Sequence, residues 1–120
     1  MGDAAGIGPE IVLKSLAEMG PDAARCVVIG DLAHLAGLQQ RFGLELQLTP
    51  MKSAARGVAV CDLANLPSEV SMGLDAPETG RAAAENIEAA VRLWREGEIG
   101  AGTLVLAEHA RAGCLVGYQG

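Results

Sequence analysis

The chain has 120 residues, half of them hydrophobic and only three of them aromatic, which is enough for one domain with an aliphatic core. A net charge of -6, with no cluster of Lys or Arg and few aromatics for base stacking, excludes a nucleic-acid groove. No apolar run approaches the roughly 18 residues that a membrane span needs, and no secretory signal is visible. We therefore expect a soluble, cytoplasmic protein.

The three cysteines are far apart, and each lies in an apolar run: Cys26, Cys61 and Cys114. An odd number at such spacing predicts reduced thiols in the core and fits neither a disulfide framework nor a zinc site.

The chain opens with a loop rich in glycine, and a helical pattern follows at once. Pro9 suits the first turn of a helix, where its missing N–H costs nothing. Apolar residues then recur at helical spacing as far as Met19, and Gly20-Pro21 supplies a stop signal. The sequence predicts a helix over residues 9–19.

The next stretch alternates strand and helix signals. Residues 25–30 form a short β-branched run, typical of a strand that is covered on both faces. Asp31 can cap a following helix that ends at Gly43. Residues 44–48 alternate apolar and polar, which predicts a half-exposed strand, and residues 58–61 predict another apolar strand.

Residues 62–80 show no period and form the longest irregular segment. A long helix is then predicted to begin at Thr79 or Gly80 and to end near Glu96, with Gly97 as its C-terminal cap. Its expected apolar face consists of Ala83, Ile87, Ala90, Val91 and Trp94.

A last strand is predicted over residues 103–107, and the remaining residues show no clear period. This alternation of strands and helices predicts an α/β fold with a mainly parallel sheet flanked by helices.

The opening loop is the strongest candidate for a site. Gly6 and Gly8 leave backbone N–H groups uncovered beside a helix N-terminus, and Asp3 adds a carboxylate, so the loop could hold a phosphate. The loop lacks the third glycine of a dinucleotide fingerprint and the Lys-Ser/Thr element of a phosphate loop. A tight turn that only redirects the chain is the alternative.

The other polar residues give weaker signals. His34 and His109 have no ligand partner at helical spacing, so neither predicts a metal site, and no serine lies in a nucleophile motif. The acidic residues of the long segment could line a cleft, but a solvated loop explains them equally well: Asp62, Glu69, Asp75 and Glu78. We assign no catalytic residue.

Residues 1–11, Met-Gly-Asp-Ala-Ala-Gly-Ile-Gly-Pro-Glu-Ile, resemble the N-terminal signature of the 4-hydroxythreonine-4-phosphate dehydrogenase family of vitamin B6 (pyridoxine) synthesis. The Ala4-Ala5 pair in this signature also suits paralogues that act on four-carbon phosphorylated sugar acids. Further similar segments follow in order, so that the resemblance covers about residues 1–100: residues 27–31, 80–83, 87–91 and 97–99.

This resemblance implies an isocitrate/isopropylmalate-dehydrogenase-like fold and a homodimer. It also implies NAD-linked oxidation of a hydroxyl group on a small phosphorylated substrate, followed by decarboxylation. A divalent metal held by three histidines from both subunits would polarise the carbonyl oxygen. The residues that match the family's signature, Gly2, Asp3, Gly6 and Gly8, are the candidates for the lining of the substrate cleft.

The end of the chain departs from the family. Residues 106–113 match neither its Thr-Ala-Pro-x-x-Lys segment nor its Gly-His-Thr-Glu segment, and its metal-binding histidines have no counterpart. We expect residues 1–107 to be a partial N-terminal α/β domain without its first strand, and residues 108–120 to be a divergent tail. We expect this chain alone to bind neither NAD nor metal and to be inactive. The alternative is a non-catalytic α/β fragment that binds an anion or mediates dimerisation.

Overall fold

The computed structural model describes residues 1, 4–51, 57–70, 73–74 and 76–99, together with the backbone of residues 103–105 and 114–118. The elements follow in chain order: α1 (Gly8–Met19), the 3-10 helix η1 (Gly20–Arg25), β1 (Cys26–Gly30), α2 (Leu32–Arg41), β2 (Leu48–Pro50), β3 (Val58–Asp62), α3 (Pro77–Arg95), β4 (Thr103–Val105) and β5 (Cys114–Tyr118).

The strands form one sheet in the order β2-β3-β1-β5-β4. The pairs β2–β3 and β3–β1 are parallel, with Val28 beside Val60. The pairs β1–β5 and β5–β4 are antiparallel. The predicted α/β class is thus confirmed, with β2, β3 and β1 forming a parallel block at one side of the sheet. Strand β5 lies in the stretch for which the sequence showed no period, and the proposed domain boundary at residue 107 stays a prediction.

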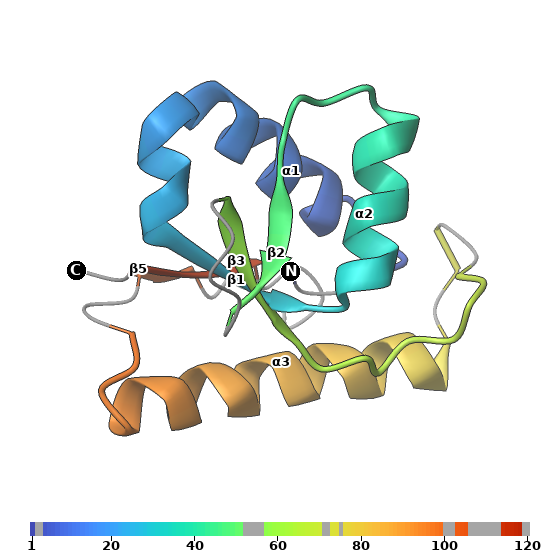
Figure 1. Cartoon of the computed structure of the whole chain (residues 1–120). Helices are drawn as coiled ribbons and strands as arrows, with labels where there is room; N and C mark the ends of the chain where they lie inside the picture. Colours follow the sequence, from blue (N-terminus) through green and yellow to red (C-terminus); the bar gives the residue numbers. More distant parts are fainter. Residues whose placement is uncertain are drawn as a thin grey trace.

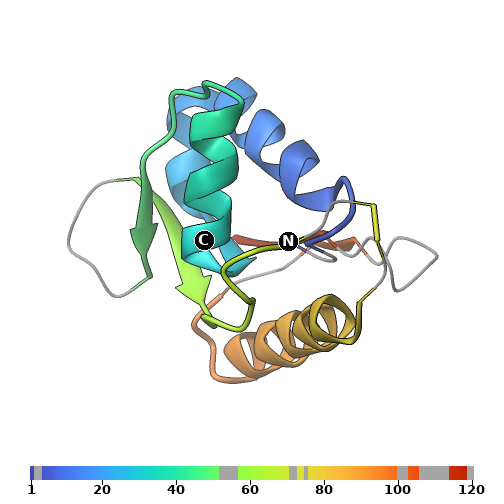
Figure 2. The same ribbon diagram turned by 90° about the vertical axis from the view of Figure 1, so that its right-hand side faces the viewer.

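Helices cover both faces of the sheet. Figure 1 shows α1 and α2 on one face and α3 alone on the other, and the side view in Figure 2 shows the same three layers. All five residues of β1 are buried. Cys26 and Val28 join the core beneath α1 and α2, whereas Val27 and Ile29 join the core above α3. The prediction of a strand covered on both faces is confirmed.

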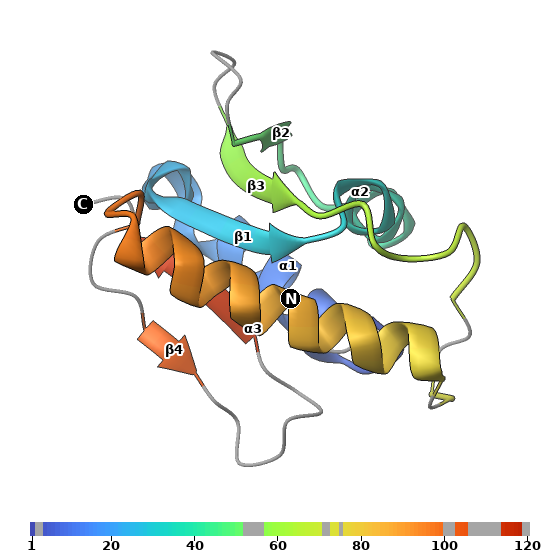
Figure 3. The same cartoon turned by 90° about the horizontal axis from the view of Figure 1, so that it is seen from below.

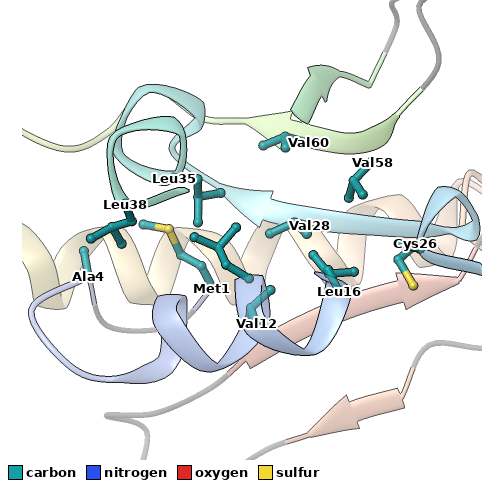
Figure 4. Close-up of a cluster of buried hydrophobic side chains, with 12 residues drawn as sticks. Met1, Ala4, Val12, Leu16, Cys26, Val28, Leu35, Leu38, Val58 and Val60 are labelled. Carbon is teal, nitrogen blue, oxygen red and sulfur yellow. The ribbon is translucent and has the colours of Figure 1, made fainter. Parts of the chain in front are cut away.

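The larger core lies between the sheet and the first two helices (Figure 4). It consists of Met1, Ala4, Val12, Leu13, Leu16, Ala23, Cys26, Val28, Leu35, Leu38, Val58 and Val60. Most are aliphatic, and each fully buried large side chain contributes roughly 1.5–3 kcal/mol to folding. The Cys26 side chain is buried as predicted, whereas Cys61 is only half-buried. The side chain of Cys114 lies outside the described residues.

The ends of α1 and α2 are set by local chemistry. Pro9 occupies the first turn of α1, and Gly20, with φ of 62°, follows its last residue. The Asp31 side chain accepts a hydrogen bond from the backbone N–H of His34 and so caps α2. Gly43, also with φ of 62°, donates to the carbonyl of Gln40 after the helix. These helix predictions are confirmed to within about a residue.

The strand predicted over residues 44–48 is wrong, because only Leu48 of that stretch lies in β2. The side-chain amide of Gln39 donates to the carbonyls of Leu44 and Leu46, at 2.9 and 2.6 Å. These two carbonyls therefore bond to a side chain of α2 and not to a neighbouring strand. The alternating pattern therefore does not form a strand over residues 44–46.

Helix α3 begins at Pro77, two residues earlier than the sequence predicted, since proline is well suited to a first helical turn. The predicted apolar face is only partly right. The buried face is made by Thr79, Ala82, Ala83, Asn86, Ala89, Ala90 and Leu93. Val91 and Trp94 are exposed instead, by 37% and 61%. Gly97 adopts φ of 71° beyond the helix, as predicted.

A substitution at Gly8 tests how closely the start of α1 packs against Met1. A Cβ atom at Gly8 would lie 2.8 Å from the backbone carbonyl oxygen of Met1, whereas a Cβ at Gly37 in α2 would meet nothing within 4 Å. We expect Gly8→Ala to lower the free energy of unfolding by about 1–3 kcal/mol, measured by urea denaturation. Gly37→Ala, the matched control, should raise it by about 0.5–1 kcal/mol. Equal stabilisation by both variants would contradict this close approach.

Candidate functional site

The opening loop is attached to the end of β1 through Met1. The Met1 ammonium donates a hydrogen bond to the carbonyl of Ile29 at 2.7 Å, and the residue is fully buried. Its side chain lies over Gly30, where an added Cβ would be 2.6 Å from the Met1 sulfur. Gly30 therefore leaves the space that Met1 fills at the carboxyl end of β1 (Figure 4).

Two further contacts fix the same loop. The backbone N–H of Gly73 donates to the carbonyl of Ala5 at 2.7 Å, which joins the loop to the long segment between β3 and α3. His34 on α2 is hydrogen-bonded to the backbone of Ala4. Met1, Ala4 and Ala5 are thus held by a strand, a helix and a distant segment.

The candidate glycines lie where this loop enters α1. Gly8 is the first residue of α1 and is buried against the Met1 carbonyl, and Gly6 is half-buried two residues before it. The N-cap residue Ile7 provides no side-chain cap to α1. Gly2 and Asp3 lie outside the described residues. A role of these four residues in substrate binding stays a prediction.

A polar cavity of about 400 Å³ opens at the carboxyl ends of β1 and β3. Its polar lining comes from Asp31, His34, Asp62 and Ser68. The carboxyl ends of parallel strands are where open α/β sheets bind ligands, so the cavity lies on the functional edge of the sheet. Sequence spacing could not reveal it, because it forms only when β3 is placed beside β1.

The two carboxylates of this cavity are already used by backbone groups. Asp31 accepts from the N–H of His34 at 2.9 Å and from the N–H of Leu66 at 3.1 Å. Asp62 accepts from the N–H groups of Leu32 and Ala64, both at 3.0 Å. Each carboxylate therefore joins segments about 30 residues apart in sequence, and both act first as structural groups.

His34 is partly buried beside Asp31. Burial lowers the pKa of His34 below its usual value, and this outweighs the Asp31 charge and the hydrogen bond to the Ala4 backbone, which both act to raise it. Its Nε2 atom is buried and has no hydrogen-bond partner among the described residues. The neutral ring is thus favoured at pH 7.

The remaining sequence candidates are dispersed. Glu69 and Glu78 are exposed residues that line two other hollows, and Asp75 and His109 lie outside the described residues. Burial raises the pKa of the half-buried Cys61 thiol, which opposes reactivity. Within the described ranges, no group of three or more His, Cys, Asp or Glu side chains could hold a metal ion. No helix in the same ranges has the length and apolar character to cross a membrane.

The double role of Asp31 can be tested by mutation. Asp31→Ala removes the α2 cap and the acceptor for Leu66, so we expect it to lower the free energy of unfolding by about 2 kcal/mol. Asp31→Asn keeps one acceptor oxygen but turns an NH2 donor toward the other backbone N–H, so it should cost more than half as much as Asp31→Ala. An Asn variant as stable as the wild type in urea denaturation would show that the fold does not depend on both acceptors.

The pKa of His34 predicts a pH dependence of stability. The unfolded ring titrates near 6.5, and the folded ring titrates lower, so the unfolded state binds more protons between these two values. The contribution to stability is complete above about pH 6.5 and is lost as the pH falls through the folded pKa. His34→Gln should flatten this part of the curve of unfolding free energy against pH, and an unchanged slope would refute the assignment.

Known proteins resemble this chain in sequence and in structure. D-threonate 4-phosphate dehydrogenase from Cupriavidus necator is 37% identical over 108 residues, which cover 84% of this chain and 32% of that protein. A crystal structure of a 4-hydroxythreonine-4-phosphate dehydrogenase from Burkholderia phymatum matches with a TM-score of 0.70 and 35% identity, over 82% of this chain and 32% of the other. A structure from Salmonella typhimurium matches with a TM-score of 0.69.

The matched residues make up most of this chain but only a smaller part of the length of each relative. The chain spans about a third of the length of the curated relatives it matches. No model of a known protein family matches the chain.

Proposed function

Because about four fifths of this chain belongs in sequence and fold to the 4-hydroxythreonine-4-phosphate dehydrogenase family, we propose that it supplies part of an oxidoreductase for a four-carbon phosphorylated hydroxy acid. The observation that carries the proposal is the 37% identity to the Cupriavidus necator dehydrogenase over nearly the whole described region. That relative is three times as long, so the activity belongs to an assembly larger than the matched residues.

We propose D-threonate 4-phosphate as the preferred substrate, with 4-phosphooxy-L-threonine as the alternative. The name of the Cupriavidus necator relative supports the first, and the solved structure from Burkholderia phymatum is named for the second. The Ala4-Ala5 form of the opening motif also favours a sugar-acid substrate.

The opening loop is the part of the site that this chain would contribute. Gly2, Asp3, Gly6 and Gly8 would line the substrate cleft, with the first-turn N–H groups of α1 available to an anion. Three hydrogen bonds support this role, since they hold residues of the loop before substrate binds. They join Met1 to Ile29, Ala5 to Gly73 and Ala4 to His34. A positioned backbone donor needs no reorganisation when charge develops on the substrate.

The reaction proposed for the complete enzyme is oxidation of the hydroxyl carbon, followed by loss of carbon dioxide from the β-keto acid. NAD, when bound, would accept the hydride. The described residues do not fit the family's divalent metal, since they contain no suitable cluster of ligands, so we assign them no step through a metal. Their contribution is to bind and orient the substrate.

A chimera tests this function in a complete enzyme. Residues 1–99 of this chain would replace the aligned part of the Cupriavidus necator dehydrogenase, and NADH formation from D-threonate 4-phosphate would be followed by absorbance. We expect an active chimera, in which Asp3→Asn lowers kcat/KM about 100-fold. Asp22→Asn, at an exposed position in η1, is the matched control and should have no effect.

The chain alone should produce no NADH from either substrate with added Mg²⁺, Mn²⁺ or Zn²⁺. A folded but inactive chimera would overturn the proposal and favour the alternative of a non-catalytic α/β module. Activity that survives Asp3→Asn would keep the family function but remove Asp3 from the site.

A further inference from the structure

The side-chain amide of Asn65, three residues after the end of β3, is buried. Neither its Oδ1 nor its Nδ2 atom has a hydrogen-bond partner among the residues that the structure describes. Burial of an amide without partners costs free energy, which is why most buried polar side chains are hydrogen-bonded. An amide that is retained in this state indicates a use other than packing.

The backbone on both sides of Asn65 is fixed by carboxylates. Asp62 accepts a hydrogen bond from the N–H of Ala64 at 3.0 Å, and Asp31 accepts one from the N–H of Leu66 at 3.1 Å. Ala64 adopts φ of 47°, a left-handed conformation that is uncommon for a residue with a Cβ atom. Strained residues of this kind persist where surrounding bonds fix them, and they gather at ligand-binding sites. The two carboxylates thus hold a strained turn around an amide that the fold does not use.

This turn lies at the polar cavity, where the chain leaves β3 and passes beside α2 (Figure 3). Ala64 and Leu66 both line the cavity, and so does His34. The Nε2 atom of His34 is also buried without a hydrogen-bond partner in the described ranges. In the neutral ring this atom is an acceptor, because the other nitrogen is the one bonded to Ala4. Asn65 and His34 thus bring three unpartnered polar atoms to the margin of one cavity.

The chemistry of these three atoms indicates the ligand. The Nε2 atom of His34 and the Oδ1 atom of Asn65 need donors, whereas the Nδ2 atom of Asn65 needs an acceptor. Hydroxyl groups supply both. The charges of Asp31 and Asp62 in the same lining oppose a phosphate or carboxylate at this point. The part of a ligand that fits here is therefore a neutral chain with neighbouring hydroxyl groups.

We propose that Asn65 binds the hydroxyl groups of a small polyhydroxylated acid, and that its amide turns into the cavity when this ligand enters. Rotation about the Cα–Cβ bond redirects the amide and leaves the bonds at Ala64 and Leu66 intact, since those bonds involve backbone N–H groups. The ligand then supplies the partners that the amide lacks in the free protein. We identify this ligand with the four-carbon hydroxy acid of the proposed function, on which this identification rests.

The stability of the free chain tests whether the amide is unpartnered. Asn65→Leu replaces it by an apolar group of similar size and should raise the midpoint of urea unfolding by about 0.5 M. Asn65→Ala, which needs less space, should not lower the midpoint. Gln40→Leu, an exposed change on α2, is the control and should leave it unchanged. A fall in the midpoint for both Asn65 variants would show that the amide is bonded within the fold and would overturn the proposal.

Nuclear magnetic resonance tests the contact without turnover. The chain has two asparagines, so the side-chain NH2 signal of Asn65 can be assigned by its loss in the Asn65→Ala variant. This signal should shift when D-threonate 4-phosphate is added to the wild-type chain at millimolar concentration. Inorganic phosphate at the same concentration should not shift it. A signal that responds to both compounds equally, or to neither, would overturn the proposal.

Kinetics of the chimera separate this contact from the proposed function. Asn65→Leu should raise KM for D-threonate 4-phosphate about tenfold, with a smaller effect on kcat, because hydroxyl groups away from the reacting carbon are bound alike in the ground and transition states. An unchanged KM would remove Asn65 from the site. An inactive chimera whose Asn65 signal still shifts in the titration would overturn the proposed function and leave this contact standing.

Discussion

Met1 approaches two glycines closely, and the arrangement of the first three elements depends on this contact. Its backbone oxygen lies where a side chain at Gly8 would be, and its sulfur lies where a side chain at Gly30 would be. Its ammonium is bonded to Ile29. The start of α1 and the end of β1 can therefore come together only because both glycines lack a Cβ atom.

This contact places the opening loop on the carboxyl edge of the sheet. Asp31 and Asp62 then join the start of α2 to residues 62–66 at the same edge through backbone N–H groups. The edge that faces the polar cavity is thus built from three stretches of the chain: the opening loop, the β1–α2 junction and residues 62–66. This edge is where we propose that the substrate cleft lies.

The two faces of the sheet are covered unequally. Two helices share one face, and α3 alone covers the other through Ala89, Ala90 and Leu93. Small alanine side chains let α3 lie close to β1, but they bury less apolar area than leucine would. The large apolar residues of α3, Val91 and Trp94, point elsewhere. This asymmetry means that α3 packs on the core with one face and leaves Val91 and Trp94 exposed.

The sequence by itself determined the elements whose signals are local. Chemistry within a few residues predicts the start of α1 at Pro9, the cap of α2 at Asp31 and the fully covered strand β1. The resemblance of the opening loop to a family signature also lies within a few residues. Only the tertiary structure decided the rest. Gln39 binds the carbonyls of Leu44 and Leu46, β5 from the far end of the chain pairs with β1, and Asp31 accepts a hydrogen bond from Leu66. The exposure of Val91 and Trp94 on α3 was also decided there, because periodicity cannot tell which apolar residues of a helix a sheet will cover.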